Sequence, residues 1–380
     1  IYICRCLLTA HSALVMIMVG FSRSALAWSL HAVLAFLLVN NGRGFVSTSP
    51  SKAFVLGGLT KQRPGSLAPP PLTRSAAAAD PSSSPPSPSA AEAAAAVVAE
   101  AEEAVGTAVR ACEEAGRVIR EKVGARLKGT KYNSRDLVTE VDYEVQAIIQ
   151  KYVDELWAPR GHEMLGEEDV PPGRFASARA LEAAAEKEWL WVVDPIDGTI
   201  NFVMGMPLSA ISIGIAHRGQ VVGGVIYDPF ADEMFTAVKG KGAFCNGEPI
   251  RVGEQGTLDE AVICAGAPPV KASLMPSLRG IQALTPKVRT LRMIGSAAIM
   301  FAWVAAGRLT AYFEPDLNSW DIAGGAILVA EAGGLVTDLD GSPYRLSTRA
   351  VLGSNGLVHD PVLEVLTEAN AIRCDDEEED

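Results

Sequence analysis

The sequence predicts a layered α/β fold, in which helices cover both faces of mixed sheets. One observation is a long Ala/Glu-rich segment whose apolar residues recur at three- and four-residue steps, as in an amphipathic helix. Another is the stretch from Ala261 onward, where short apolar runs with strand character alternate with helical segments. Elements in this kind of order build sheets that carry helices on both faces.

Two helices are predicted where the folded part of the chain begins. The first ends at Gly124, and its apolar positions are Val97, Ala101, Val105, Ala108, Cys112, Ala115 and Ile119. The second runs from about Asp142 to Trp157, and its apolar face consists of Val145, Ile148, Ile149, Tyr152, Val153 and Leu156. An apolar stripe of this width lets a helix pack on a sheet.

The predicted strands begin with the apolar run 189–193, which is typical of a short buried strand. Two alternating strands, 210–216 and 221–227, flank the turn Arg218-Gly219, and a further hairpin spans 233–252. Its glycine-containing turns lie at 239–242 and 246–247. The apolar runs that follow predict strands at 261–265, 309–313, 335–338 and 350–354, and helices near 296–306, 321–332 and 360–370.

The most informative segment, Asp194-Pro-Ile-Asp-Gly-Thr199, comes directly after the buried strand. Its proline fixes a backbone angle and its glycine permits a sharp turn, so Asp194 and Asp197 are held on a stiff loop. The Ile196 carbonyl lies between them, and hard divalent cations prefer such clusters of carboxylate and carbonyl oxygens. The alternative is an Asx-type turn, in which the two carboxylates only accept hydrogen bonds from backbone amides.

Two more acidic segments make the metal interpretation stronger. Gly166-Glu167-Glu168-Asp169 lies upstream of the strand, and Trp320-Asp321 places a carboxylate at the head of a later helix. Taken alone, the first segment reads as a solvated run of charges, and Asp321 reads as a helix N-cap. Their joint occurrence with the Asp194 segment favours one shared site.

These segments, in this order, resemble the inositol monophosphatase family of magnesium-dependent, lithium-sensitive phosphatases. Members share an Asp-Pro-Ile/Leu-Asp-Gly-Thr motif and a Trp-Asp-x-Ala-Gly motif, which read here as 194–199 and 320–324. The resemblance runs from roughly Ala91 to Ile372 and includes 136–142, 166–168 and 295–297. It implies a five-layer αβαβα sandwich, a small phosphate ester as substrate, and a homodimer.

The resemblance also implies roles for individual residues. Two or three Mg²⁺ ions would be held by Glu167, Asp194, the Ile196 carbonyl, Asp197 and Asp321. Catalytic roles would fall to Thr199, which hydrogen-bonds the attacking water, to Asp142, which orients Thr199, to Glu167, which helps take the proton, and to Lys131 near the metal site. The implied substrate-binding residues are Asp194, Ile196, Asp197, Gly198, Thr199, Gly295, Ser296, Ala297, Glu314 and Asp321.

Several of these residues have simpler interpretations. The Thr199 hydroxyl and the Asp142 carboxylate could each only cap a helix, and Glu314 could be a surface carboxylate at a strand end. Lys128 competes with Lys131 for the position of the family lysine. Two departures from the family pattern are Ile200, where threonine is usual and which is expected to alter packing beneath the phosphate loop, and the pair Gly324-Gly325.

The predicted reaction is the Mg²⁺-dependent hydrolysis of inositol 1-phosphate. Histidinol-phosphate phosphatase and 3′(2′),5′-bisphosphate nucleotidase are alternatives within the same chemistry, and a non-catalytic binding module on this fold is an alternative from another class. None of the five histidines falls within the motifs. The nearest of them in sequence, His162, is expected at the surface rather than as a ligand.

Charge and cysteine content restrict the partners and the compartment. The net charge is −12, although residues 1–90 contain seven Lys/Arg and a single acid, so the rest of the chain is strongly acidic. A body this acidic, without a basic stripe, is a poor nucleic-acid binder. Six cysteines without paired spacing indicate free thiols in a reducing compartment rather than a disulfide framework or a zinc site.

The sequence predicts three regions: a leader at 1–90, a catalytic domain at 91–372 and an acidic tail at 373–380. Residues 1–39 are mostly apolar, and 40–90 are rich in Ser, Pro and Ala, with Lys/Arg outnumbering acids. This succession resembles the two-part plastid leaders of algae, so a largely disordered leader, plastid targeting and no stable membrane association of the mature form are expected. Another organelle, or a membrane anchor at the N-terminal apolar segment, is the alternative.

Overall fold

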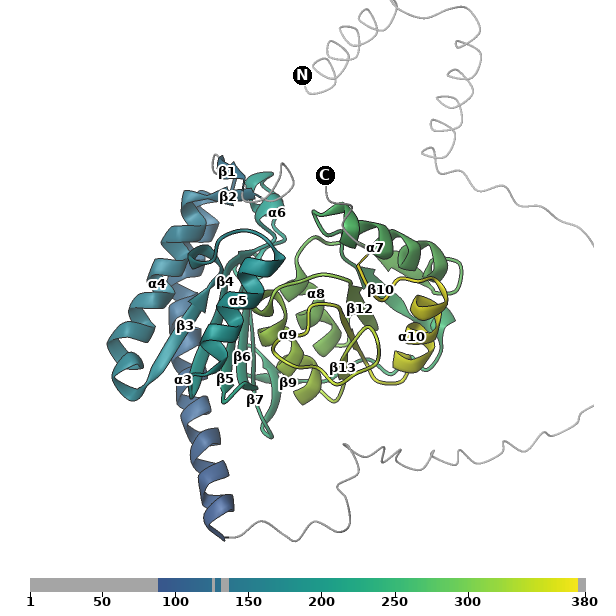
Figure 1. Ribbon diagram of the computed structural model, residues 1–380. Helices are drawn as coiled ribbons and strands as arrows, with labels where there is room; N and C mark the ends of the chain where they lie inside the picture. The colour runs from purple at the N-terminus through teal and green to yellow at the C-terminus, as the bar shows by residue number, and fades with distance from the viewer. Residues whose placement is uncertain (1–87, 125–126, 131–136, 375–380) are drawn as a thin grey trace, which may run out of the picture. The chain divides into compact units, whose positions relative to one another are not determined.

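The computed structural model describes residues 88–124, 127–130 and 137–374 (Figure 1). Its larger sheet has the strand order β3-β4-β5-β6-β7-β8-β9, in which β3 and β4 are parallel and all other neighbours are antiparallel. The strands are β3 (His162–Gly166), β4 (Trp189–Asp197), β5 (Ala210–His217), β6 (Gln220–Asp228), β7 (Glu233–Val238), β8 (Gly242–Cys245) and β9 (Glu248–Ile250). The predicted buried strand and both predicted hairpins are confirmed.

Helices α3 (Pro88–Lys122) and α4 (Glu140–Leu156) cover one face of this sheet. Most of their predicted apolar residues, including Ala108 and Ile149, belong to one core cluster with Trp191 of β4 and Ile213 of β5. The predicted Leu156 is an exception, because it is 47% exposed. Because β4 is buried along its whole length, its alternate residues Leu190 and Val192 face the opposite side, where they belong to another apolar cluster.

The opposite face is covered by α8 (Ala297–Ala305) and α9 (Ser319–Glu331), which lie between the two sheets (Figure 1). Helix α9 approaches the larger sheet at glycines. A Cβ atom on Gly214 of β5 would lie 2.4 Å from the Ala323 Cβ, and one on Gly224 of β6 would lie 2.8 Å from the Gly324 carbonyl oxygen. Glycine at these positions therefore allows the close packing that places the start of α9 beside the end of β4.

The second sheet has the order β11-β10-β12-β14-β13, with β10 parallel to β11 and β12 and with β14 antiparallel to its neighbours. Its strands are β10 (Val262–Ala265), β11 (Thr290–Arg292), β12 (Ala311–Glu314), β13 (Leu335–Asp338) and β14 (Val351–Ser354). Helices α7 (Lys271–Leu284) and α10 (His359–Glu368) cover its outer face. The order helix, sheet, helix, sheet, helix confirms the expected five-layer αβαβα sandwich.

Some elements were not predicted. These are β3, β11, α5 (Arg174–Ala185), α7 and the short two-stranded sheet of β1 (Leu127–Thr130) and β2 (Leu137–Thr139). Helix α5 is rich in alanine, and its buried contact rests on few residues, among them Leu181. Helix α7 contains Pro276, a residue that usually argues against a helix interior. The helical signal of α5 is therefore weak, and that of α7 is opposed by its proline.

The expectation that His162 lies at the surface was wrong, because the residue is only 1% exposed. Its ring stacks on Trp189 with 4.7 Å between the centroids, and its Nδ1 accepts a hydrogen bond from Trp191 Nε1 at 3.1 Å. Nε2 lies 3.2 Å from Glu100 Oε1. His162 thus joins α3 to β3 and β4, and its role in the structure is to satisfy a buried indole N–H.

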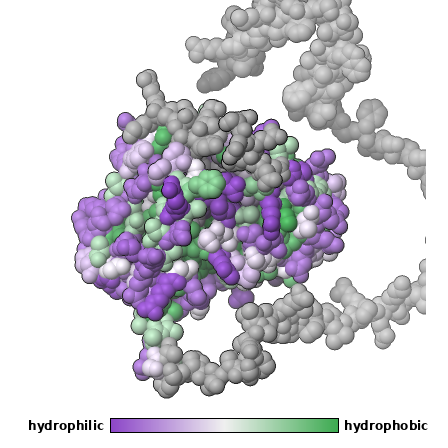
Figure 2. Space-filling view, in the orientation of Figure 1, coloured by the Kyte–Doolittle hydropathy of each residue, from purple (hydrophilic) through white to green (hydrophobic). Residues whose placement is uncertain are grey.

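The surface of the described residues carries both hydrophilic and apolar residues. On the face seen in Figure 2, hydrophilic residues predominate and apolar residues occur in small groups among them. In the ranges that the structure describes, no helix combines the length and the apolar character needed to cross a membrane. The predicted leader up to residue 87, Lys131 and the acidic residues 375–380 lie outside the described residues.

Candidate active site

The site begins at a bulge at the end of β4. Asp194 pairs with Ser212 and Asp197 with Ala210, so one extra residue is inserted between the two acids. A bulge of this kind bends the strand and redirects its side chains. Asp194 Oδ1 accepts a hydrogen bond from the Ile196 amide at 3.0 Å, so the Asx-type turn is present as well. This turn fixes the loop, and both Asp194 and Asp197 still take part in the carboxylate cluster.

Asp321 comes from the first turn of α9. The helix begins one residue after its N-cap Asn318, which places Asp321 at the third helical position and not at the N-cap. Its Oδ2 accepts a hydrogen bond from the Asn318 amide at 2.6 Å, as in a capping box. Ser212 Oγ of β5 donates to the Trp320 carbonyl at 3.0 Å, which ties this turn to the strand that pairs with Asp194.

One carboxylate oxygen from each of Asp194, Asp197 and Asp321 lies within 4.8 Å of the other two. Burial raises the pKa of Asp197 to about 6, even though it accepts hydrogen bonds from Ser296 Oγ at 2.5 Å and from the Ala298 amide at 2.6 Å. Burial, followed by the charges of Glu167 and Asp197, raises the pKa of Asp321 well above its usual range. Acids gathered in this way repel one another until a cation neutralises them.

Glu167 completes the acidic side of the site. It opens the short 3₁₀ helix η2 (Glu167–Asp169) directly after β3, is half-buried, and lines the same pocket as the three aspartates. The next amide, that of Glu168, donates to Gln146 Oε1 of α4 at 2.9 Å. Of the three acids in this segment, only Asp169 is exposed. The interpretation as a solvated run of charges therefore holds for Asp169 and not for Glu167.

Thr199 is the first residue of α6 (Thr199–Val203), which follows Gly198 in a left-handed conformation. Its hydroxyl does not cap the helix: Oγ1 lies 3.1 Å from the Ile196 carbonyl oxygen and 3.4 Å from Asp142 Oδ1. Asp142 is not the N-cap of α4 either. That position belongs to Thr139, whose amide donates to Asp142 Oδ2 at 2.9 Å. The other carboxylate oxygen of Asp142 is the one directed at Thr199.

A pocket of about 520 Å³ adjoins these residues. Glu314 lines it from the end of β12 and is buried, so the surface-carboxylate interpretation was wrong. Burial raises the pKa of Glu314 to about 8, and the Tyr312 hydroxyl donates to its Oε2. Ile200 also lines the pocket and is 45% exposed, so it does not pack beneath the loop as expected. The remaining predicted residues on its wall are Ile196, Gly198, Thr199, Gly295, Ser296 and Ala297.

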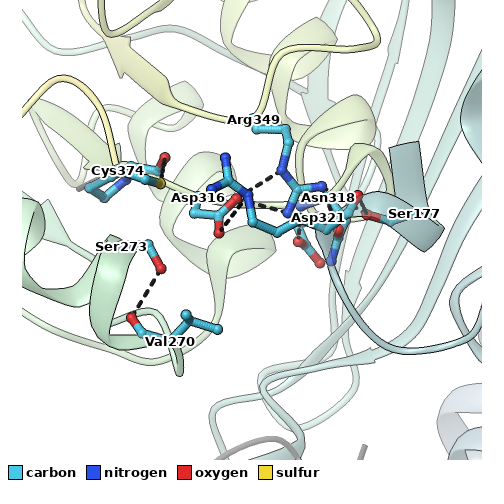
Figure 3. Close-up of polar contacts among 10 residues, drawn as sticks. Ser177, Val270, Ser273, Asp316, Asn318, Asp321, Arg349 and Cys374 are labelled. Carbon is cyan, nitrogen blue, oxygen red and sulfur yellow. Dashed lines mark hydrogen bonds and ion pairs between the residues drawn. The ribbon is translucent and has the colours of Figure 1, made fainter. Parts of the chain in front are cut away.

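Sequence reasoning assigned no individual roles in one polar part of this wall. Asp316, Asn318 and Ser177 line the pocket, and Arg349 joins all three (Figure 3). A signal existed for Asn318, because Asn is a common N-cap and Asp321 follows it at the spacing of a capping box. Arg349 comes from a distant segment and carries no local signal.

A five-layer α/β sandwich with buried carboxylates converging on a polar pocket defines the class of layered sugar and inositol phosphatases. The inositol monophosphatase family model matches residues 100–371. The chain is 37% identical over 270 residues to inositol monophosphatase 3 of Solanum lycopersicum, which covers 70% of this chain and 97% of that protein. The chain belongs to the inositol monophosphatase family and is a phosphoric monoester hydrolase.

Other relatives and solved structures agree. A fructose-1,6-bisphosphatase/inositol-1-monophosphatase of Thermotoga maritima is 38% identical over 239 residues, covering 63% of this chain and 85% of that protein. An IMPase structure from Thermotoga maritima has a TM-score of 0.61 and 33% identity, covering 70% of this chain and 98% of that one. An inositol monophosphatase structure from Anabaena gives a TM-score of 0.60 and 30% identity, covering 70% and 96%.

Proposed function

We propose that this protein hydrolyses inositol 1-phosphate to inositol and phosphate in a Mg²⁺-dependent reaction. The observation that carries the proposal is the convergence of Asp194, Asp197 and Asp321 beside a polar pocket that also contains Glu167 and Glu314. The names of the relatives support a small phosphate ester as the substrate. A pocket of about 520 Å³ lies within the usual range of small-molecule sites.

The donor set fits a hard divalent cation. Glu167, the three aspartates and the Ile196 carbonyl supply only oxygen, and no histidine or cysteine is found among the described residues that line the pocket. Oxygen-only sites favour Mg²⁺ over softer metals. Mg²⁺ bound there supplies positive charge, which makes the phosphoryl group more electrophilic and stabilises the departing alkoxide.

The chain's own residues would position the water and accept its proton. When the Thr199 hydroxyl donates a hydrogen bond to Asp142, Thr199 Oγ1 can still accept a hydrogen bond from a water on the pocket side. Glu167 faces the same space and would act as the general base. Glu314 and residues 295–297 line the same pocket. They would bind the hydroxyl groups of the alcohol.

The assembly and location of the protein are also proposed. The resemblance to the family supports a homodimer and inhibition by Li⁺, and the composition of residues 1–90 supports delivery to a plastid. The acidic body supports a small-molecule partner rather than nucleic acid. Size-exclusion chromatography with light scattering tests the dimer, and imaging of a fluorescent fusion of the full chain tests the location.

A phosphate-release assay of the purified protein tests the reaction. Inositol 1-phosphate, histidinol phosphate, 3′-phosphoadenosine 5′-phosphate and fructose 1,6-bisphosphate are compared at equal concentration, each with Mg²⁺ and with a chelator. We expect the highest kcat/KM for inositol 1-phosphate, no turnover with the chelator and inhibition by Li⁺. Preference for another ester would refute inositol 1-phosphate as the main substrate. Background turnover of all four esters would support a non-catalytic binding module on this fold.

A further inference from the structure

Arg349 connects three separate parts of the chain around the pocket wall (Figure 3). It lies just before β14 and reaches Ser177 of α5 and the segment 315–318 that joins β12 to α9. Its Nε and Nη2 atoms each lie 2.8 Å from Asp316 Oδ1. Nη1 donates at 2.9 Å to Asn318 Oδ1 and at 2.9 Å to Ser177 Oγ.

All three acceptors line the pocket, whereas Arg349 itself stands behind them. The Asp316 side chain is only 7% exposed, and its second oxygen lies 3.7 Å from Arg174 Nε. A buried carboxylate in this position needs a close cation, and Arg349 provides it with two nitrogens. The backbone reinforces the contact, because the Leu317 amide donates to the Arg349 carbonyl at 2.9 Å.

The same network reaches the carboxylate cluster of Asp194, Asp197 and Asp321. Asn318 accepts from Arg349 through its side chain and donates through its backbone amide to Asp321 Oδ2 at 2.6 Å. One residue thus joins the guanidinium to a carboxylate of the cluster. Groups that hold a metal ligand from behind fix its orientation, and their loss typically weakens metal binding or activity by about 10–100-fold.

We propose that Arg349 is a positioning residue for this site, which holds the polar wall formed by Asp316, Asn318 and Ser177 and, through Asn318, orients Asp321. The proposal rests on the proposed function for its kinetic effect, but its effect on cation binding is independent of the substrate. The planar guanidinium is required because three acceptors on two separate segments are satisfied at once. A lysine at this position presents a point charge that cannot hold all three.

The competing interpretation is an ion pair that only stabilises the fold. The chain offers a matched control, because Arg308 binds Glu233 through two nitrogens at 2.5 and 2.6 Å and neither residue lines the pocket. Replacing Arg308 with lysine therefore weakens another two-nitrogen arginine–carboxylate pair, away from the site. A general effect on stability would appear in both variants.

The experiment compares wild type, Arg349→Lys and Arg308→Lys in the full chain. We expect Arg349→Lys to raise KM for inositol 1-phosphate about tenfold with kcat reduced less than about threefold, and to raise the Mg²⁺ dissociation constant about tenfold in calorimetry without substrate. Arg308→Lys should change each quantity less than about twofold. Arg349→Lys values within twofold of wild type, or equal changes in both variants, would overturn the proposal.

A second variant guards against misfolding of Arg349→Lys. Ser177→Ala removes one uncharged acceptor of Arg349 at the pocket wall, and it should raise KM by about two- to fivefold with little change in Tm. Unchanged KM and Mg²⁺ affinity in Ser177→Ala and in a folded Arg349→Ala contradict the positioning role. If wild type binds Mg²⁺ but does not hydrolyse inositol 1-phosphate, the proposed function fails, and the calorimetric comparison still decides the role of Arg349.

Discussion

Asp142 Oδ1 lies 3.4 Å from Thr199 Oγ1, although the two residues are 57 positions apart and belong to the first turns of different helices. The carboxylate is fixed on its other side, where Oδ2 accepts hydrogen bonds from the Thr139 amide at 2.9 Å and the Thr139 hydroxyl at 2.5 Å. The capping box of α4 therefore aims one oxygen of Asp142 at a hydroxyl on the pocket wall. The hydrogen bonds that cap α4 therefore also orient the carboxylate that would position Thr199 in the reaction.

Replacing Thr199 with valine should lower kcat about 100-fold or more, because the variant keeps the shape of the side chain but cannot hydrogen-bond a water. Thr199→Ser keeps the hydroxyl and should retain kcat within about threefold. Steady-state phosphate release with saturating Mg²⁺ measures both. A valine variant with more than half of the wild-type kcat would remove Thr199 from the reaction.

Asp197→Asn should lower turnover by more than about 100-fold while the protein stays folded. The amide oxygen can still accept hydrogen bonds from Ser296 and Ala298, but the charge that a cation requires is lost. Activity and circular dichroism of the variant are compared with those of Asp259→Asn, which alters an exposed acid in the 3₁₀ helix Leu258–Glu260. Near-normal rates in Asp197→Asn would contradict the metal-dependent reaction.

The acids at the end of β4 could be predicted from the sequence because they share one rigid local segment. Their meeting with Asp321 could not be derived from spacing, since it depends on how closely α9 packs on the sheet at Gly214 and Gly224. The resemblance to a family supplied that convergence, together with the position of Glu314. Local patterns predict a strand and its loop, whereas a site assembled from distant elements requires the tertiary structure.

The errors have the same physical origin. His162 follows an exposed turn and is polar, so local composition favours the surface, yet three tryptophans (Trp157, Trp189 and Trp191) enclose its ring. Arg349 looks like a surface charge until α5 and the β12–α9 segment fold against it. Long-range polar contacts of this kind leave no trace in hydrophobic periodicity.

The metal-free protein should lose stability as the pH rises from 6.5 to 8. Burial raises the pKa of Glu314 to about 8 in the folded state, whereas the unfolded carboxyl ionises near its ordinary value of 4.5. In this window the folded state therefore binds more protons than the unfolded state, and the free energy of unfolding falls with pH, by about 1–2 kcal/mol for this group. Urea unfolding in the presence of a chelator measures the change.

Two comparisons assign that pH dependence. Glu314→Gln should reduce the slope, and added Mg²⁺ at pH 8 should restore stability to the wild type. Burial lowers the pKa values of His162 and His359, the latter to about 4, so both affect stability only below about pH 6.5. Burial also raises the pKa values of Asp197 and Asp321, so these two acids account for the pH dependence that remains in Glu314→Gln. Wild-type stability that stays flat or rises between pH 6.5 and 8 would contradict the assignment.

Gly198 should tolerate alanine worse than another glycine with a similar backbone angle. Gly198 has φ +91°, and a Cβ atom there would lie 2.9 Å from the Leu208 carbonyl oxygen and 3.1 Å from that of Gly295. Gly219, in the β5–β6 turn, has φ +75° and nothing within 4 Å of an added Cβ. Alanine at either position incurs the left-handed backbone cost of about 1–2 kcal/mol, but only at Gly198 must the neighbouring backbone also move.

Because Asp197 and Thr199 flank Gly198, movement of the backbone there should also abolish turnover, while Gly219→Ala stays active. Urea unfolding and phosphate release of the two variants separate these effects, and equal losses in both would show that the close contact at Gly198 is unimportant.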